Sequence, residues 1–211
     1  MNMLWLGVVA LLASGCLVKD TTETIYLEPH GAVTWSVLEK DVRSDEKRAQ
    51  DRAREENAFS AAAAAERHPI AIAFARLNAA DVRTVIVRDR RPFTVLTEAR
   101  FPRLDTLMAA FAAQAGARAT SALDRRDGLV TWTWTISEDD SVERGDDGKE
   151  MSALADSFEG CRFVLSAGHF ISAVGFELSH DRNVATLRIP DATHGTGPAD
   201  PLRFSLIWTE E

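Results

Sequence analysis

The strictest constraint on the fold is a run of alternating apolar and polar side chains in the second half of the chain. The apolar positions are Val130, Trp132, Trp134 and Ile136, and threonine occupies the three positions between them. A period of two places the apolar set on one face of a β-strand. The turn pair Asp127-Gly128 separates this run from residues 118–123, so the segment predicts a β-hairpin with one buried face.

Other segments predict further strands of the same kind. Thr21–Leu27 and Ala32–Leu38 flank the turn Pro29-His30-Gly31, and residues 82–88 and 93–101 flank Asp89-Arg90-Arg91-Pro92. Residues 162–165, 171–178, 184–189 and 202–208 are also typical of strands. These pairs predict a mostly antiparallel sheet built from several hairpins.

Three segments predict longer helices, and a short fourth helix is expected over residues 151–158. Residues 44–67 are rich in Ala, Glu and Arg, and Ser44 is suited to the N-cap of a long charged helix with a thin apolar stripe. Pro69 can begin a second helix with Ile70, Phe74 and Leu77 on one face, and residues 104–115 predict a third. The expected fold class is α+β, with helices packed on one face of the sheet and residues 21–211 in a single domain.

The charge balance restricts the possible partners. The chain has 24 Lys and Arg against 32 Asp and Glu, which gives a formal net charge of −8. Binding to nucleic acid without regard to sequence needs a surplus of Lys and Arg, so we expect no nucleic-acid partner. Two cysteines, Cys16 and Cys161, cannot form a disulfide framework.

The N-terminus has the pattern of an export signal. Residues 1–18 carry no charged side chain, and Leu4–Ala13 has the length of a signal-peptide hydrophobic region. The sequence Ala13-Ser14-Gly15-Cys16 that follows resembles the lipobox of bacterial lipoproteins. The resemblance implies a signal peptide over 1–15, a diacylglycerol on Cys16, acylation of the new amino group, and a lipidated tether over 16–20.

The same resemblance implies a location. Leu17, rather than Asp, after the cysteine is similar to lipoproteins sent to the periplasmic face of the outer membrane. A strand after the cysteine, then Pro29-His30-Gly31 and a second strand, loosely resembles uncharacterised envelope lipoproteins. Two alternatives remain open: an uncleaved signal anchor over Met1–Val18, or a secretory signal in which Cys16 is unmodified.

No motif predicts catalysis, a cofactor or a metal site. The sequence contains no H-E-x-x-H, G-x-S-x-G or phosphate-binding glycine loop. His30, His68, His169, His180 and His194 stand apart, and we expect them in turns or on the surface. Residues 137–150 predict a solvated acidic loop, and Ser179-His180-Asp181 predicts a turn, because consecutive strand residues point to opposite faces.

The remaining conspicuous residues have structural interpretations. Trp35, Trp132, Trp134 and Trp208 lie at the apolar positions of alternating strands, so we expect them in the core. Cys161 begins a strand-like run and is expected in the core as well. The arginines at 88, 90 and 91 and at 100 and 103 flank one hairpin, where phosphate headgroups or ordinary hairpin charge are both possible.

Together these patterns predict a membrane-anchored envelope lipoprotein that acts as a non-catalytic binding or assembly module. Its expected partners are the membrane, through Cys16, and an envelope protein, through the helix over residues 44–67. Two alternatives are a carrier of lipid or another small hydrophobic ligand, and an envelope hydrolase whose site has no recognised motif.

Overall fold

A computed structural model describes residues 17–65, 67–114, 118–137, 160–188 and 201–209. The fold is α+β, as predicted, with strands in the hydrogen-bonded orders β3-β4-β2-β1-β7-β10-β9 and β5-β6-β11-β8. The chain divides into two compact units: Thr34–Phe101 with the residues up to Thr24, and Ile25–Val33 with Pro102–Glu211. The strands β1 (Leu17–Leu27) and β2 (Val33–Ser44) contribute residues to both units.

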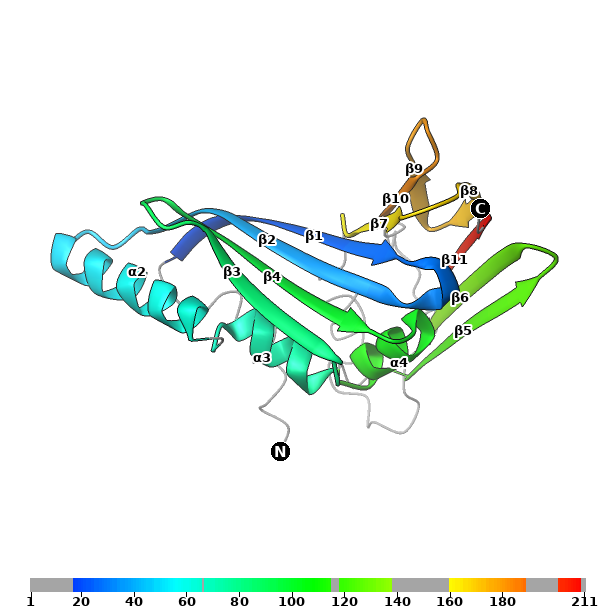
Figure 1. Ribbon diagram of the computed structural model, residues 1–211, viewed down its shortest axis with the longest axis horizontal. Helices are drawn as coiled ribbons and strands as arrows, with labels where there is room; N and C mark the ends of the chain where they lie inside the picture. The colour runs from blue at the N-terminus through cyan, green and yellow to red at the C-terminus, as the bar shows by residue number, and fades with distance from the viewer. Residues whose placement is uncertain (1–16, 66, 115–117, 138–159, 189–200, 210–211) are drawn as a thin grey trace, which may run out of the picture. The chain divides into compact units, whose positions relative to one another are not determined.

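The first unit is a sheet covered on one face by two helices. It contains the unit's share of β1 and β2 together with β3 (Asp81–Arg88) and β4 (Phe93–Phe101), which pair antiparallel as predicted. The helices α2 (Ala49–Ala64) and α3 (Pro69–Arg76) lie along one face of this sheet (Figure 1). Residues 93, 95, 97, 99 and 101 of β4 are all buried, so that face is the helix-covered one.

A backbone irregularity in β2 changes which of its residues point inward. Val33, Trp35, Val37 and Glu39 are buried at alternate positions. Asp41 has φ 52°, in the left-handed region, and after it the buried positions are Val42 and Ser44. An extra residue of this kind shifts the alternation by one, as a β-bulge does.

The helix α3 follows the predicted pattern. Pro69 occupies its first turn, and Ile70, Phe74 and Leu77 are buried. Phe74 packs against Trp35 with ring centroids 5.1 Å apart and against Phe101 at 6.0 Å. Trp35 is therefore a core residue of the first unit, as predicted.

The long charged helix is shorter than the predicted span of 44–67. Ser44 is the last residue of β2 rather than the N-cap of α2, and its Oγ accepts a hydrogen bond from the Glu46 amide at 3.2 Å. The helix begins at Ala49, after a connection whose carbonyl oxygens at Glu46 and Lys47 accept hydrogen bonds from the Arg52 guanidinium. Serine favours both turns and N-caps because its hydroxyl competes for backbone amides, which explains why the pattern placed the start too early.

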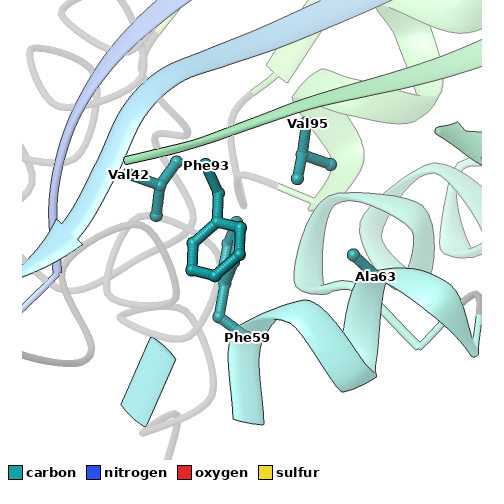
Figure 2. Close-up of a cluster of buried hydrophobic side chains, with 5 residues drawn as sticks. All are labelled: Val42, Phe59, Ala63, Phe93 and Val95. Atoms are coloured by element: carbon teal, nitrogen blue, oxygen red, sulfur yellow. The ribbon is translucent and has the colours of Figure 1, made fainter. Parts of the chain in front are cut away.

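The thin apolar stripe of α2 is packed within the unit. Phe59 and Ala63 lie against Val42, Phe93 and Val95, and this cluster is shown in Figure 2. Leu17 and Ile86 are partly buried against the same cluster. One aromatic side chain and small alanines thus hold α2 to the sheet.

The second unit contains the hairpin that the alternating residues 130–136 predict. β5 (Arg118–Arg126) and β6 (Leu129–Ser137) pair around Asp127 and Gly128, which have φ 54° and 76°. Such a turn needs left-handed backbone at both central residues, and an Asp-Gly pair provides it. Within this unit α4 (Leu104–Gln114) packs against β5 and β6.

Aromatic rings fill the core of the second unit. β11 (Leu202–Thr209) pairs with β6, and Trp134 lies opposite Phe204 with ring centroids 5.5 Å apart. Trp132 stacks on Trp134 at 6.2 Å and on Phe163 at 5.6 Å. Trp132, Trp134 and Trp208 are at most 3% exposed, so their predicted place in the core is confirmed.

The remaining strands of this unit are short. They are β7 (Arg162–Leu165), β8 (Phe170–Val174), β9 (Phe176–Leu178) and β10 (Val184–Leu187). The 3-10 turn η1 (Pro29–Gly31), which connects β1 and β2, belongs to the same unit. The predicted strand over 171–178 is divided at Gly175, which has φ 77°. A Cβ at Gly175 would lie 2.5 Å from Phe204 Cδ1, so the ring occupies the space that a side chain would need.

Candidate functional site

The most chemically distinctive part of the described chain lies on β1 and β2 of the first unit. β1 begins at Leu17, directly after Cys16, which itself lies outside the described residues together with the predicted signal peptide. Residues 17–20, predicted as part of a tether, belong to this strand. The first ionisable side chain after Cys16 is Lys19, and it points to the helix-covered face.

Lys19 ends in a buried ion pair. Its Nζ donates to Glu39 Oε1 at 2.5 Å, and the Glu39 side chain is fully buried. The second oxygen of Glu39 lies 3.0 Å from Nε2 of His68, which is 1% exposed. Burial favours the neutral acid, but the contacts with His68 and Lys19 outweigh it, so the pKa of Glu39 lies below its ordinary value.

His68 is held at the junction of the two helices. It precedes Pro69 at the N-terminus of α3, where its carbonyl accepts the Ile72 amide at 3.0 Å. Its ring meets Phe59 of α2 edge to face with centroids 5.1 Å apart. The expectation that every histidine lies in a turn or on the surface is therefore wrong for His68, because Pro69 begins a helix there and turns the ring toward Glu39.

Glu23 lies on the same face of β1 as Lys19, and its pKa is changed in the opposite direction to that of Glu39. Burial of Glu23 raises its pKa to about 7 from 4.5; a hydrogen bond from Trp35 opposes the rise, and the charge of Glu39 adds to it. Two neighbouring carboxyl groups with opposite pKa changes are common at functional sites, and also in structural ion networks. The surroundings decide between these interpretations.

The surroundings favour a structural role. Throughout the part of the chain that the structure describes, no group of three or more His, Cys, Asp or Glu side chains could hold a metal ion. Glu39 is fully buried and enclosed by its two partners, so a substrate could not reach it. The cluster of Lys19, Glu39 and His68 instead joins the start of β1 to the N-terminus of α3.

A second set of polar contacts fixes the neighbouring turn. Glu56 of α2 accepts the Ser44 amide at 3.1 Å through Oε1, and Arg91 Nε lies 2.6 Å from its Oε2. Ser44 Oγ donates to Glu55 Oε2 at 2.5 Å. These contacts attach α2 both to the end of β2 and to the turn between β3 and β4.

The two arginine clusters differ in what their side chains contact. Arg88 and Arg90 of the β3–β4 turn are exposed. Arg103 forms a bidentate pair with Asp105, with distances of 2.9 and 2.6 Å, and this pair lowers the pKa of the Asp105 carboxyl. Arg103 is thereby neutralised locally, while the β3–β4 turn keeps two solvated guanidinium groups.

A small cavity lies in the second unit. It measures about 200 Å³ and is lined mainly by Leu27, Pro29, Leu165, Ala167 and Trp208, with Glu28 and His30 at its polar side. Cavities that hold drug-sized ligands measure about 300–1,000 Å³, so this one suits a few water molecules or a very small ligand. It does not favour the alternative of a lipid carrier.

The remaining residues considered as site candidates either have the positions predicted for them or lie outside the described residues. Ser179-His180-Asp181 forms a turn, in which Ser179 Oγ donates to Asp181 Oδ1 at 2.6 Å and lowers the pKa of that carboxyl. His30, His169 and His180 are exposed, and Cys161 is buried, as predicted. Most of the acidic loop, a predicted short helix over 151–158, and His194 lie outside the described residues.

Sequence reasoning did not identify the buried cluster, although one sign of it was available. Val33, Trp35 and Val37 define the inward face of β2, and Glu39 continues the same alternation. A carboxylate at the next inward position of an apolar strand predicts a buried charge that needs a partner. The partners themselves, Lys19 and His68, come from distant segments and carry no local pattern.

Comparisons with known proteins add little. No family model and no curated protein matches the chain. The chain is similar to the NMR structure of the folded domain of LppM from Mycobacterium tuberculosis, with 11% sequence identity, a TM-score of 0.37, and coverage of 93% of this chain and 91% of that one. In the described residues, no helix is long and apolar enough to cross a membrane.

Proposed function

We propose that this protein is an envelope lipoprotein, anchored through Cys16, whose folded part binds partners at the membrane surface without catalysing a reaction. The observation that supports the proposal is the absence of a spacer between Cys16 and the fold, since β1 begins at Leu17. Lys19 is tied to Glu39 in the core of the first unit. An acylated Cys16 would therefore hold this unit directly against the bilayer.

Stable anchoring is expected from the chemistry of the modified cysteine. One acyl chain gives marginal binding, and two or more hydrophobic signals give a stable anchor. With three chains on Cys16 the protein would remain in the membrane. Leu17 after the cysteine supports the periplasmic face of the outer membrane as the destination.

The experiment is metabolic labelling with radioactive palmitate in a bacterial host, followed by envelope fractionation. The wild-type protein is expected to be labelled and membrane-bound, and C16A unlabelled. C161A is the matched control, because it removes the other cysteine and should leave the label unchanged. Unlabelled wild-type protein would contradict the proposal, and its release or retention would then separate a secretory signal from an uncleaved anchor.

The assembly role is proposed for the outward side of α2. Phe59 and Ala63 pack against the sheet of the first unit, whereas Arg54, Asn57 and Ala61 face solvent. A photo-crosslinking residue at position 61 should recover a reproducible envelope protein, and one at the equally exposed Ala75 of α3 should not. Recovery of no partner from position 61 would count against an assembly role while leaving the anchor untouched.

A further inference from the structure

The end of the first unit that adjoins Cys16 also carries the β3–β4 turn. Leu17, at the start of β1, and Ile86, near the end of β3, pack against the same apolar cluster around Phe59. Figure 1 shows the start of β1 and the β3–β4 turn at the same end of this sheet. Whatever holds Cys16 in a bilayer therefore brings this turn close to it.

The exposed charges at this end are positive in excess, although the chain as a whole is acidic. Arg88 and Arg90 flank Asp89 in the turn, while Arg91 forms an ion pair with Glu56. The end of β2 and the connection to α2 add further exposed charges. With the start of β1 included, the exposed basic residues are Lys40, Arg43, Lys47, Arg48, Arg88 and Arg90, and the exposed acidic residues are Asp20, Asp41, Asp45 and Asp89.

Two exposed apolar side chains accompany these charges. Val87 is 60% exposed immediately before Arg88, and Val18 is 45% exposed two residues after Cys16. Val18 lies between Leu17 and Lys19, which face the helices, so it lies on the other face of the sheet. Val87 follows the inward Ile86 at a register shift, after which Arg88 pairs with Thr94, so Val87 and Arg88 lie on that same other face. Apolar side chains beside arginines are typical of segments that lie in the headgroup region of a bilayer.

We propose that Val18, Val87, Arg88 and Arg90 form an anchor-side surface that contacts anionic phospholipid headgroups of the membrane holding Cys16. This inference rests on the proposed lipid anchor. Headgroup attraction acts within about one Debye length, roughly 8 Å at physiological salt, so only residues close to the anchor take part. Each arginine near an anionic surface shifts the equilibrium toward contact by about fivefold, and two shift it by about 25-fold.

The test uses the lipidated full chain in vesicles of phosphatidylcholine, alone or mixed with phosphatidylglycerol, that contain spin-labelled lipid. A fluorophore on V87C reports contact through quenching, because Cys16 is acylated and Cys161 is buried. R83C is the matched control, since Arg83 is also exposed on β3 and lies about 13 Å further along the strand. Flotation of the vesicles is recorded in parallel.

The expected result is strong quenching at position 87 in phosphatidylglycerol vesicles, weak quenching at position 83, and loss of the difference in R88Q/R90Q. R83Q removes the same type of charge from the same strand and should leave the quenching at 87 unchanged. Protein that floats but is quenched equally at both positions, or equally in both lipids, would overturn the anchor-side surface alone. Protein that does not float would refute the proposed anchor and this inference together.

Discussion

The raised pKa of Glu23 makes a quantitative prediction about stability and pH. In the unfolded chain this carboxyl ionises near 4.5, whereas in the folded protein it holds its proton to about pH 7. Between these values the folded state binds more protons than the unfolded state, so the free energy of unfolding falls as pH rises. The interval is about 2.5 pH units, and at about 1.4 kcal/mol per unit the full loss is about 3–4 kcal/mol, of which roughly 2–3 kcal/mol falls between about pH 5 and about pH 8.

The substitution Glu23→Gln removes this titration and keeps an amide that can still contact Trp35. The variant should show a flat free energy of unfolding between about pH 5 and about pH 8, where the wild type declines. The free energy of unfolding of the variant should therefore equal or fall below that of the wild type at about pH 5. At about pH 8 it should exceed that of the wild type by roughly 2–3 kcal/mol. The difference arises because burial penalises the charged carboxylate and not the amide.

Urea unfolding at a series of pH values measures this difference, with the slope m checked for constancy. Carbon NMR of the side-chain carboxyl gives the pKa of Glu23 directly. Glu98→Gln on β4 is the matched control, since it removes another carboxyl of the first unit and should leave the wild-type slope in place. Parallel stability curves for wild type and Glu23→Gln, or titration of Glu23 near 4.5, would refute the reasoning.

Four further substitutions test the packing. Glu39→Gln leaves its buried partners without their counter-charge and should destabilise the protein by about 3–5 kcal/mol, measured by urea unfolding near neutral pH; a cost below about 1 kcal/mol would show that the ion pair is solvated. Phe59→Ala should cost about 3–5 kcal/mol in the same assay, because this ring is the largest side chain that α2 contributes to the cluster, and a near-neutral effect would mean that α2 is held by its polar contacts. Gly168→Ala should be far more damaging than Gly128→Ala, since a Cβ at 168 would lie 2.0 Å from the Thr209 carbonyl oxygen and one at 128 meets nothing within 4 Å. The second change should cost about 1–2 kcal/mol for its positive φ alone, and equal thermal unfolding midpoints for the two variants would contradict the difference.

The elements of the fold that follow from local periodicity were predictable. Trp132 and Trp134 alternate with threonines, and Asp127-Gly128 supplies a backbone geometry that joins such strands tightly. Pro69 likewise begins α3 where its missing amide costs nothing. In each case the residues that decide the structure are neighbours in sequence, so their pattern carries the information.

The boundary of α2 and the buried cluster depend on contacts between distant segments. Ser44 could cap a helix or end a strand. The hydrogen bond from its backbone amide to the Glu56 carboxylate selects the strand. His68 has no distinctive neighbours in sequence, yet Glu39 makes its burial tolerable. Local patterns cannot predict such choices, because the deciding partner lies far along the chain.

The inward face of β1 changes character along its length, and this change bears on how an anchor would act. Near Cys16 the inward residues are Leu17, Lys19 and Glu23, whereas Ile25 and Leu27 follow further on. At the start of β1 a directional ion pair is therefore added to the apolar packing of Leu17. Ion pairs between buried groups fix one register, since a displaced charge would lose its partner inside the core. A pull on Cys16 would therefore reach α3 through Lys19, Glu39 and His68 in a few contacts.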